Sequence, residues 1–132
     1  MGYLFEFDAA NNVLRCTWEG QVTDDMLFEC SSAARRLLAS HPACRGMEDY
    51  SRVTKLDISS EAISRMAEMQ PVFAPDSMHV IVAPQDLTFG LARMYSMLGE
   101  QNRPNLHVVR TMEEAYSLLG ITHPQFSRVS AA

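Results

Sequence analysis

The sequence predicts an α/β fold in which one mixed sheet is packed against helices, and three features of the chain support this. A β-type run at residues 78–83 breaks at Pro84 and continues directly into an apolar-striped helix. A second β-type run, residues 105–110, leads into another helix, so these strands are predicted to be parallel and joined by helical crossovers. Near the start, the β-type runs 3–7 and 13–18 flank the turn-forming segment DAANN and predict a hairpin.

The length and composition of the chain fit a single domain. Of the 132 residues, 47% are hydrophobic and 20% are charged, which is enough apolar surface for one core. We expect this domain to span residues 1–121. Residues 122–132 show no hydrophobic period and end in small side chains, so we expect them to form a partly disordered tail.

The charge and hydropathy of the chain exclude several classes of function. The net charge of -5 and the pI of about 5.3 leave no general basic surface for nucleic acid. No segment approaches the roughly 20 apolar residues of a membrane span. The N-terminal MGYLFEFD carries acids where a signal peptide carries basic residues. We therefore expect a cytoplasmic protein with no nucleic-acid partner and no membrane span.

The first predicted helix follows the hairpin. Thr23 is a suitable N-cap, and Asp24 and Asp25 occupy the first turn, where the helix dipole favours negative charge. The helix is predicted to end near Ser40, because the residue before Pro42 resists the helical conformation. Its apolar stripe, which should face the sheet, comprises Met26, Leu27, Cys30, Ala33, Ala34, Leu37 and Leu38.

The next strand is predicted at residues 45–53, although Glu48 and Asp49 interrupt its apolar pattern. A parallel strand is required between the first and second crossover helices, and this segment is the one available. The second helix then begins at the pair Ser59 and Ser60, either of which can serve as N-cap.

The third predicted helix is apolar on more than one side. Its main stripe is predicted to be Leu87, Leu91, Met94 and Leu98. Other large side chains fall outside this stripe and need a cover, which a second copy of the chain, an adaptable ligand groove or the core itself could provide. Of these, we favour a homodimer. Gly90 is expected to allow close packing of this helix, and Arg93 is its one cation, able to pair with an acid or an anionic head group.

The last predicted helix has the clearest local signal. Thr111 and Glu114 form a capping box at its start, and Gly120 ends it. The order of elements is therefore β-β-α-β-α-β-α-β-α.

With this order, the chain resembles the STAS domains of anti-sigma-factor antagonists, and more closely the SpoIIAA-like branch of small bacterial proteins. The resemblance is carried by the segments EGQVTDDML, DYSRVTKLDISSEAI and VAPQDLTFGLARMYSML, within residues 3–120. It implies a five-stranded sheet with an antiparallel first strand and parallel others, surrounded by about four helices. It also implies a non-catalytic protein that docks to a kinase-type, anti-sigma-like or other partner, or that holds a small or lipid-like ligand.

The resemblance further implies a phosphoacceptor at Ser59 or Ser60, following Asp57 at the end of the third strand. A phosphate there would be favoured by the helix dipole and would repel an acidic partner. The simpler interpretation is that one of these serines only caps the helix. The Ser-Gly step that usually accompanies the phosphoacceptor is replaced here by Ser60-Glu61.

The turn from residue 83 to Asp86 is a second possible site, because it joins a parallel strand to a helix N-terminus with free backbone N–H groups. Asp86 is more simply a structural acid that already occupies the dipole. In full, the residues predicted at a ligand site or interface are Asp57, Pro84, Asp86, Phe89, Gly90, Arg93, Tyr95 and Met97.

No catalytic motif, metal site or cofactor site is predicted. Cys16 and Cys30 have the spacing of core residues, whereas Cys44 lies beside basic and histidine side chains that could lower a thiol pKa. His79 and His107 lie in neighbouring predicted strands and could bind a metal or shuttle protons, but a structural role is the more common one. We expect no enzyme activity.

The sequence therefore predicts a non-catalytic regulatory or binding module that acts through protein–protein interaction, as a homodimer. The alternative is a carrier of a small apolar or lipid-like ligand, with Arg93 as its polar anchor.

Overall fold

The computed structural model describes residues 2–41 and 43–130. The elements alternate as predicted, with one strand more at the end. They are β1 (Tyr3–Asp8), β2 (Val13–Thr23), α1 (Asp24–Leu38), β3 (Arg45–Asp57), α2 (Ser60–Glu68), β4 (His79–Val82), α3 (Asp86–Leu98), β5 (Leu106–Val109), α4 (Met112–Leu119) and β6 (Ser127–Val129).

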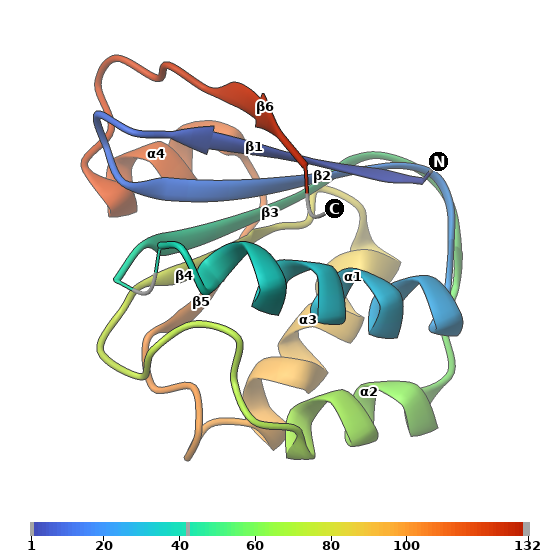
Figure 1. Cartoon of the computed structure of the whole chain (residues 1–132). Helices are drawn as coiled ribbons and strands as arrows, with labels where there is room; N and C mark the ends of the chain where they lie inside the picture. Colours follow the sequence, from blue (N-terminus) through green and yellow to red (C-terminus); the bar gives the residue numbers. More distant parts are fainter. Residues whose placement is uncertain (1, 42, 131–132) are drawn as a thin grey trace.

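The strands form one mixed sheet in the order β5-β4-β3-β2-β1-β6 (Figure 1). Strands β2, β3, β4 and β5 pair in parallel, and β1 pairs antiparallel with β2. The mixed α/β sheet and its antiparallel first strand are therefore confirmed. The predicted number of five strands is wrong, because β6 adds a sixth strand, antiparallel to β1.

Part of the segment predicted as a disordered tail is instead anchored to the hairpin. β6 pairs with β1 from Phe5 opposite Val129 to Phe7 opposite Ser127. The fully buried carboxylate of Asp8 accepts hydrogen bonds from the backbone N–H groups of Asn11, at 3.0 Å, and Gln125, at 2.8 Å. The strand pairing and the bond from Gln125 join residues more than 110 positions apart, so no local period in the tail reveals them.

The two central strands are longer than predicted. β2 continues past Trp18 to Thr23 because its pairing with β3 absorbs two register shifts, one between Thr17 and Glu19 and the next between Gly20 and Gln21. Gly20 has φ of 75°, a left-handed conformation that glycine adopts without a steric penalty. Gly20 therefore marks an irregularity within β2 and does not end that strand.

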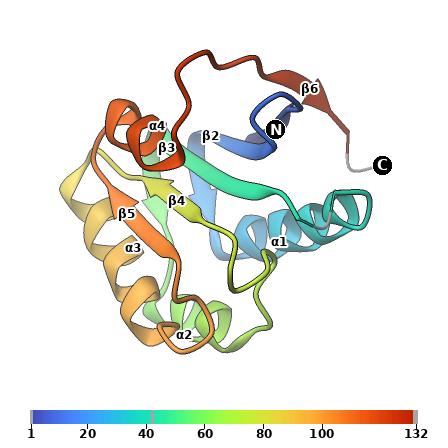
Figure 2. The same ribbon diagram turned by 90° about the vertical axis from the view of Figure 1, so that its left-hand side faces the viewer.

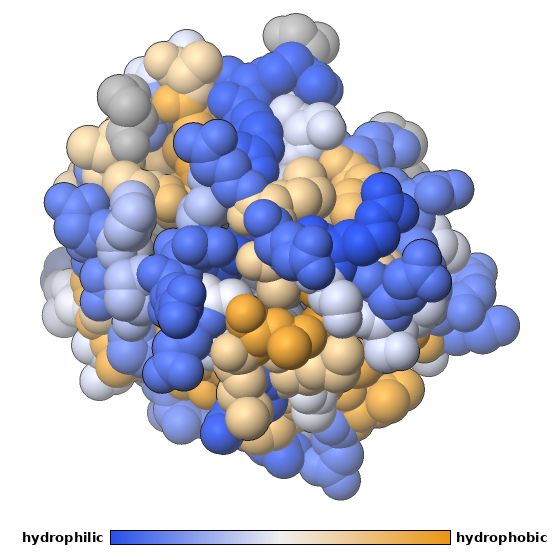
Figure 3. All heavy atoms as spheres, turned by 90° about the horizontal axis from the view of Figure 1, so that it is seen from below, coloured by the Kyte–Doolittle hydropathy of each residue, from blue (hydrophilic) through white to orange (hydrophobic). Residues whose placement is uncertain are grey.

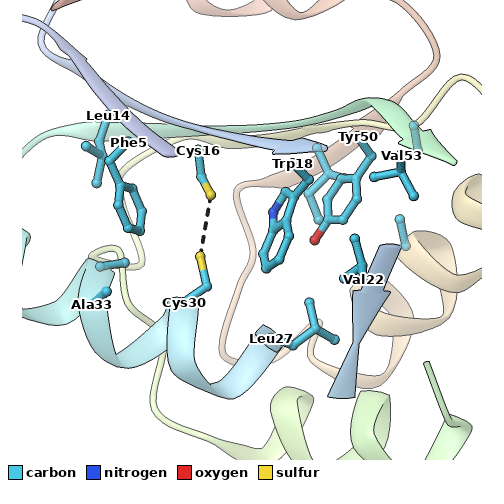
Figure 4. Packing of buried hydrophobic residues seen from close by; sticks show 14 of the residues in the cluster. Phe5, Leu14, Cys16, Trp18, Val22, Leu27, Cys30, Ala33, Tyr50 and Val53 are labelled. Carbon is cyan, nitrogen blue, oxygen red and sulfur yellow. Dashed lines mark hydrogen bonds between the residues drawn. The ribbon is translucent and has the colours of Figure 1, made fainter. Parts of the chain in front are cut away.

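Helices cover the two faces of the sheet unequally (Figures 1 and 2). α4 packs on one face, where Ala115 and Leu119 contact a core that includes Met47 and Val80. On the other face lie α1 and α3, with α2 farther from the sheet and packed against α3. Figure 4 shows the larger core on this face, where Cys16 and Trp18 of β2 point toward α1.

The predicted apolar stripe of α3 is wrong, because its two end residues are exposed. Leu87 is 62% exposed and Leu98 is 55% exposed, whereas the small residues Thr88 and Ala92 are buried. A helix that is apolar on several sides does not indicate from its period which side faces the sheet. Here the side with the small residues Thr88 and Ala92 faces inward, because small side chains allow the helix to approach the sheet more closely. Gly90 is exposed with open space around it, so its expected role in close packing is also wrong.

The predicted helix starts are confirmed at three helices. Thr23, Ser59 and Thr111 each accept a backbone hydrogen bond at the N-terminus of α1, α2 and α4, respectively. The capping box between Thr111 and Glu114 is complete, and Gly120 ends α4 with φ of 67°.

We predict that Asp8→Ala releases the tail and lowers the free energy of unfolding by about 1–3 kcal/mol, since two partly buried N–H groups lose their charged acceptor. Hydrogen exchange at residues 125–129 should rise sharply, as measured by mass spectrometry. Asp76→Ala, at an exposed acid in a loop, is the matched control and should leave both quantities unchanged. Unaltered exchange in Asp8→Ala would contradict this role.

Candidate functional site

A cavity of about 130 Å³ lies in the core between the sheet and the helices α1, α2 and α3. One water needs only about 15 Å³, so this is more than a packing defect. Its wall combines residues from the sheet with residues from all three helices. Apolar wall residues include Phe5, Leu14, Trp18 and Ile81 from strands and Leu27, Ile63, Met66, Leu91 and Ala92 from helices.

A cluster of polar side chains from β2, β3 and β4 lies in this apolar wall. Oε2 of Glu48 is 2.9 Å from Nε2 of His79, and the hydroxyl of Tyr50 donates to Oε1 of Glu48 at 3.3 Å. Glu48 and Tyr50 are two residues apart on one strand, so they share a face, and β4 places His79 beside them. Side chains alternate between the two faces along each strand, and this alternation places the cluster on the face that α1, α2 and α3 cover.

The carboxyl group of Glu48 is held in its ionised form. Burial alone would raise its pKa, but His79, Trp18 and Tyr50 together keep the pKa below its ordinary value. The side chain of Glu48 retains 23% of its accessible surface and that of His79 retains 13%, and both line the cavity. The cavity wall thus contains a negative charge that a ligand can reach.

Trp18 adds an unpaired donor to the same region. Its side chain is 1% exposed, lines the cavity and stacks on Tyr50 with ring centroids 5.6 Å apart. Its Nε1–H lies close enough to Glu48 to lower the pKa of that carboxyl group, but it does not reach hydrogen-bond geometry with any atom that the structure describes. Figure 4 shows the indole beneath the sheet beside Tyr50.

The segment between α2 and β4 closes one side of the cavity. Phe73 packs against the ring of His79, with centroids 4.7 Å apart, and fills the space beside Gly46. A Cβ atom on Gly46 would lie 2.2 Å from the Phe73 ring, so a larger residue would force this ring away. Gly46 is thus required for the closed position of the segment.

Two arginines in the wall have structural partners. Arg103 donates to the carbonyl oxygens of Met66, Ala67 and Met69 at the C-terminus of α2, at 2.9–3.1 Å. Arg35 donates to the carbonyl oxygen of Gln70. Both guanidinium groups therefore hold the end of α2 and the start of the closing segment in place.

The cysteines behave as buried thiols. Sγ of Cys16 lies 3.4 Å from Sγ of Cys30, and both line the cavity (Figure 4). The hydrogen bond to Cys30 and burial raise the pKa of Cys16 well above its ordinary value. Burial raises the pKa of Cys44 to about 11, which contradicts the expectation that its basic neighbours would lower it.

The predicted phosphoacceptor residues lie outside the cavity wall. The hydroxyl of Ser59 accepts from the backbone N–H of Ala62 at 3.1 Å and donates to Asp24 at 2.7 Å. Ser60 is the exposed first residue of α2, and Asp57 is the exposed end of β3. Ser59 thus acts as an N-cap and also ties the starts of α1 and α2 together.

The structure brings together three of the residues predicted at the turn before α3. Arg110 donates to Asp86 at 2.6 Å and to the carbonyl oxygen of Pro84 at 3.4 Å, and its guanidinium group lies 4.1 Å from the Phe89 ring centroid. The Asp86 side chain is 94% exposed, so this ion pair stabilises little.

The remaining predicted residues of α3 do not form one site. Tyr95 faces inward and lines the cavity, and burial raises its pKa to about 12. Gly90, Arg93 and Met97 are exposed outside the cavity wall, with Met97 at 68%. Figure 3 shows apolar side chains grouped between hydrophilic ones on the face seen from below.

The two strand histidines do not converge. His107 lies opposite Val80 in the pairing of β4 with β5, whereas His79 lies opposite Leu106, so their side chains point to opposite faces. Within residues 2–41 and 43–130, no group of three His, Cys, Asp or Glu side chains could hold a metal ion. In the same ranges, no helix is both long and apolar enough to cross a membrane.

The polar cluster itself was not predicted. The signal for it in the sequence is Glu48, a charged residue at an inward position of a buried strand. With Asp49 it interrupts the apolar pattern of that strand, and the two adjacent acids cannot converge on one substrate because they point to opposite faces. Since β4 supplies His79 and β2 supplies Trp18, the partners of Glu48 lie 31 and 30 residues away along the chain. Local patterns do not reveal such a cluster.

We predict that Ser59→Ala lowers the free energy of unfolding by about 1 kcal/mol, because α2 loses its N-cap. Ser60→Ala is the matched control and should have little effect. Chemical denaturation of both variants measures the difference. Equal effects of the two substitutions would contradict the assignment of Ser59 as the cap.

We predict that Glu48 contributes to acid sensitivity. Because its folded pKa is lowered, its contribution to stability is present above its ordinary pKa of 4.5 and is lost as the pH falls through the folded value. Urea unfolding from pH 7 to pH 3 should therefore give a flatter curve for Glu48→Gln than for the wild type. Parallel curves for the two proteins would contradict this.

The comparisons with known proteins identify the fold. The chain matches no protein-family model, and no curated protein matches it. A solved structure similar to it is that of an uncharacterised protein of the DUF3478 family with a SpoIIAA-like fold, from Shewanella loihica PV-4. The match has a TM-score of 0.56 and 14% identity, and covers 89% of this chain and 91% of the other. The predicted resemblance is thus confirmed at the level of fold: the chain adopts a SpoIIAA-like fold.

Proposed function

We propose that this protein is a non-catalytic module that binds a small, largely apolar ligand in the cavity between the sheet and α1, α2 and α3. The cavity itself is the observation that carries this proposal. Protein interiors are close-packed and contain few voids larger than a water molecule. A cavity of about 130 Å³ in a chain of 132 residues therefore needs an explanation.

The energetic cost of an empty cavity favours a ligand. At about 24 cal/mol per Å³, a fully enclosed void of 130 Å³ would correspond to roughly 3 kcal/mol of lost stability, which is an upper bound for this partly open cavity. That is a large part of the roughly 5–15 kcal/mol by which domains of this size are stable. Filling the cavity with a ligand offsets this loss, so the free energy of ligand binding also stabilises the fold.

The wall supports binding rather than catalysis. A catalytic nucleophile needs a base beside it and a means to stay reactive. The pKa of the Cys16 thiol is raised, which keeps it protonated near neutral pH. His79 is paired with Glu48, and their contacts with Tyr50 and Phe73 hold them as part of the wall.

The proposal is tested with N-phenyl-1-naphthylamine, an uncharged apolar fluorophore that brightens in apolar surroundings. We expect saturable binding with one site per chain. Ala92→Leu, which places a larger side chain in the wall from α3, should weaken binding at least tenfold, equivalent to about 1.4 kcal/mol. Ala39→Leu, at the exposed C-cap of α1, is the matched control and should bind as the wild type does.

Ala34→Leu repeats the same test from the α1 side of the wall, in case Ala92→Leu does not fold. Native mass spectrometry of freshly purified protein is the complementary measurement, with a retained mass of a few hundred daltons expected. Absence of fluorophore binding by the folded wild type, or equal binding by the filled variants, would overturn the proposal.

A second candidate function is protein–protein interaction through α3, as the sequence favoured. Leu87, Met97 and Leu98 are each more than half exposed on this helix. Such apolar side chains are typical of a surface that a second copy or another protein covers. A homodimer is the simplest form, and a kinase-type or anti-sigma-like partner acting in the cytoplasm is the form that the fold resemblance suggests.

Light scattering coupled to size-exclusion chromatography tests the homodimer. We expect a dimer mass for the wild type and a monomer mass for Leu98→Lys. Leu118→Lys, on α4 and 41% exposed, is the matched control and should remain a dimer. A monomeric wild type would contradict dimerisation through α3.

A further inference from the structure

We infer that the cavity selects a ligand with an apolar body and an uncharged polar head that both donates and accepts hydrogen bonds, such as a hydroxyl or a primary amide. This inference rests on the proposed function and specifies the class of ligand. It follows from the incomplete hydrogen bonding of the polar cluster around Glu48.

Glu48 requires a donor. A carboxylate has about four acceptor positions on its two oxygens. Here Oε2 has His79 as its partner and Oε1 has a long contact of 3.3 Å with Tyr50, so acceptor capacity remains. Since Glu48 lines the cavity and its side chain keeps 23% of its accessible surface, a ligand N–H or O–H can use that capacity.

Trp18 requires an acceptor. Its Nε1–H is a donor only and lies in the same wall, near Glu48, but within the part of the chain that the structure describes it makes no hydrogen bond of normal geometry. Leaving a buried donor unpaired is unfavourable, so a ligand acceptor at this position is favoured. A hydroxyl or amide satisfies Glu48 and Trp18 at once, whereas an ammonium group cannot accept and a carboxylate cannot donate.

Charge excludes an anionic head at this position. A carboxylate beside the ionised Glu48 would place two like charges together in apolar surroundings, where their repulsion is poorly screened. The guanidinium groups of Arg35 and Arg103 also line the cavity, but their described hydrogen bonds go to backbone carbonyls at the end of α2. The cluster therefore discriminates against fatty-acid-type ligands.

An ammonium head is disfavoured for a different reason. His79 and Tyr50 already provide donors to the carboxylate of Glu48. Burying an ammonium group there would cost its full desolvation, while the carboxylate already shares its acceptor positions with these two donors. It would also leave the donor of Trp18 unpaired.

The test compares four ligands with the same apolar chain: 1-octanol, octanamide, octanoate and octylamine. Trp18 is the only tryptophan in the sequence and lines the cavity, so its fluorescence reports occupancy directly. We expect 1-octanol and octanamide to bind at least about tenfold more tightly than octanoate and octylamine at pH 7. This comparison uses the wild-type protein and does not depend on any variant.

Glu48→Gln tests the origin of the selectivity. It keeps the shape of the side chain and removes the charge, so octanoate should bind at least about tenfold more tightly than to the wild type. Binding of 1-octanol should weaken, because its hydroxyl loses a charge-assisted acceptor, so the preference for 1-octanol over octanoate should shrink. Glu113→Gln makes the same chemical change on α4, on the opposite side of the sheet, and should keep the wild-type preference.

The outcomes separate this inference from the proposed function. If octanoate or octylamine binds the wild type as tightly as 1-octanol, the head-group selectivity is overturned while the binding function stands. If Glu48→Gln folds and still rejects octanoate, the role of Glu48 is overturned. If none of the four ligands nor the uncharged fluorophore binds, the proposed function itself fails.

Discussion

The structure depends on the parallel pairing of its two longest strands, β2 and β3. Parallel neighbouring strands need a crossover element between them. Helix α1 is this element, and it lies on the face of the sheet with the larger core. Because a parallel sheet is buried on both faces, helices must then cover each side. α4 covers one face with Ala115 and Leu119, while three helices share the other face. The cavity arises on this shared face, where α2 lies farther from the sheet than α1 and α3 (Figures 1 and 2).

The spacing around the cavity is held by specific contacts rather than by close packing. Arg103 holds the C-terminus of α2 through three backbone carbonyl groups. Ser59 and Asp24 hold its N-terminus to the start of α1. Phe73 then closes the side between α2 and β4, in a position that requires glycine at residue 46. With both ends of α2 fixed in this way, the helix does not collapse onto the sheet.

An ionised carboxylate in an apolar wall is unfavourable unless it has partners. His79 and Tyr50 supply such partners to Glu48, although they leave acceptor positions and the donor of Trp18 unused. A core built for stability alone would place apolar side chains there. The cavity and the polar cluster coincide in space, and their coincidence underlies both the ligand-binding proposal and the predicted preference for an uncharged head group.

The sequence by itself determined the order of the first nine elements, the mixed sheet and the caps at Thr23 and Thr111, because these depend on hydrophobic periods and on hydrogen bonds within a few residues. It limited the cap of α2 to Ser59 or Ser60, and the structure decided for Ser59. The sequence did not determine β6, which needs Asp8 to bind the backbone of Gln125. It also did not determine which side of α3 faces inward, since that helix is apolar on several sides. The cluster of Glu48, His79 and Trp18 was decided only by the tertiary structure. Its members lie on three strands and become neighbours only through the register of the sheet.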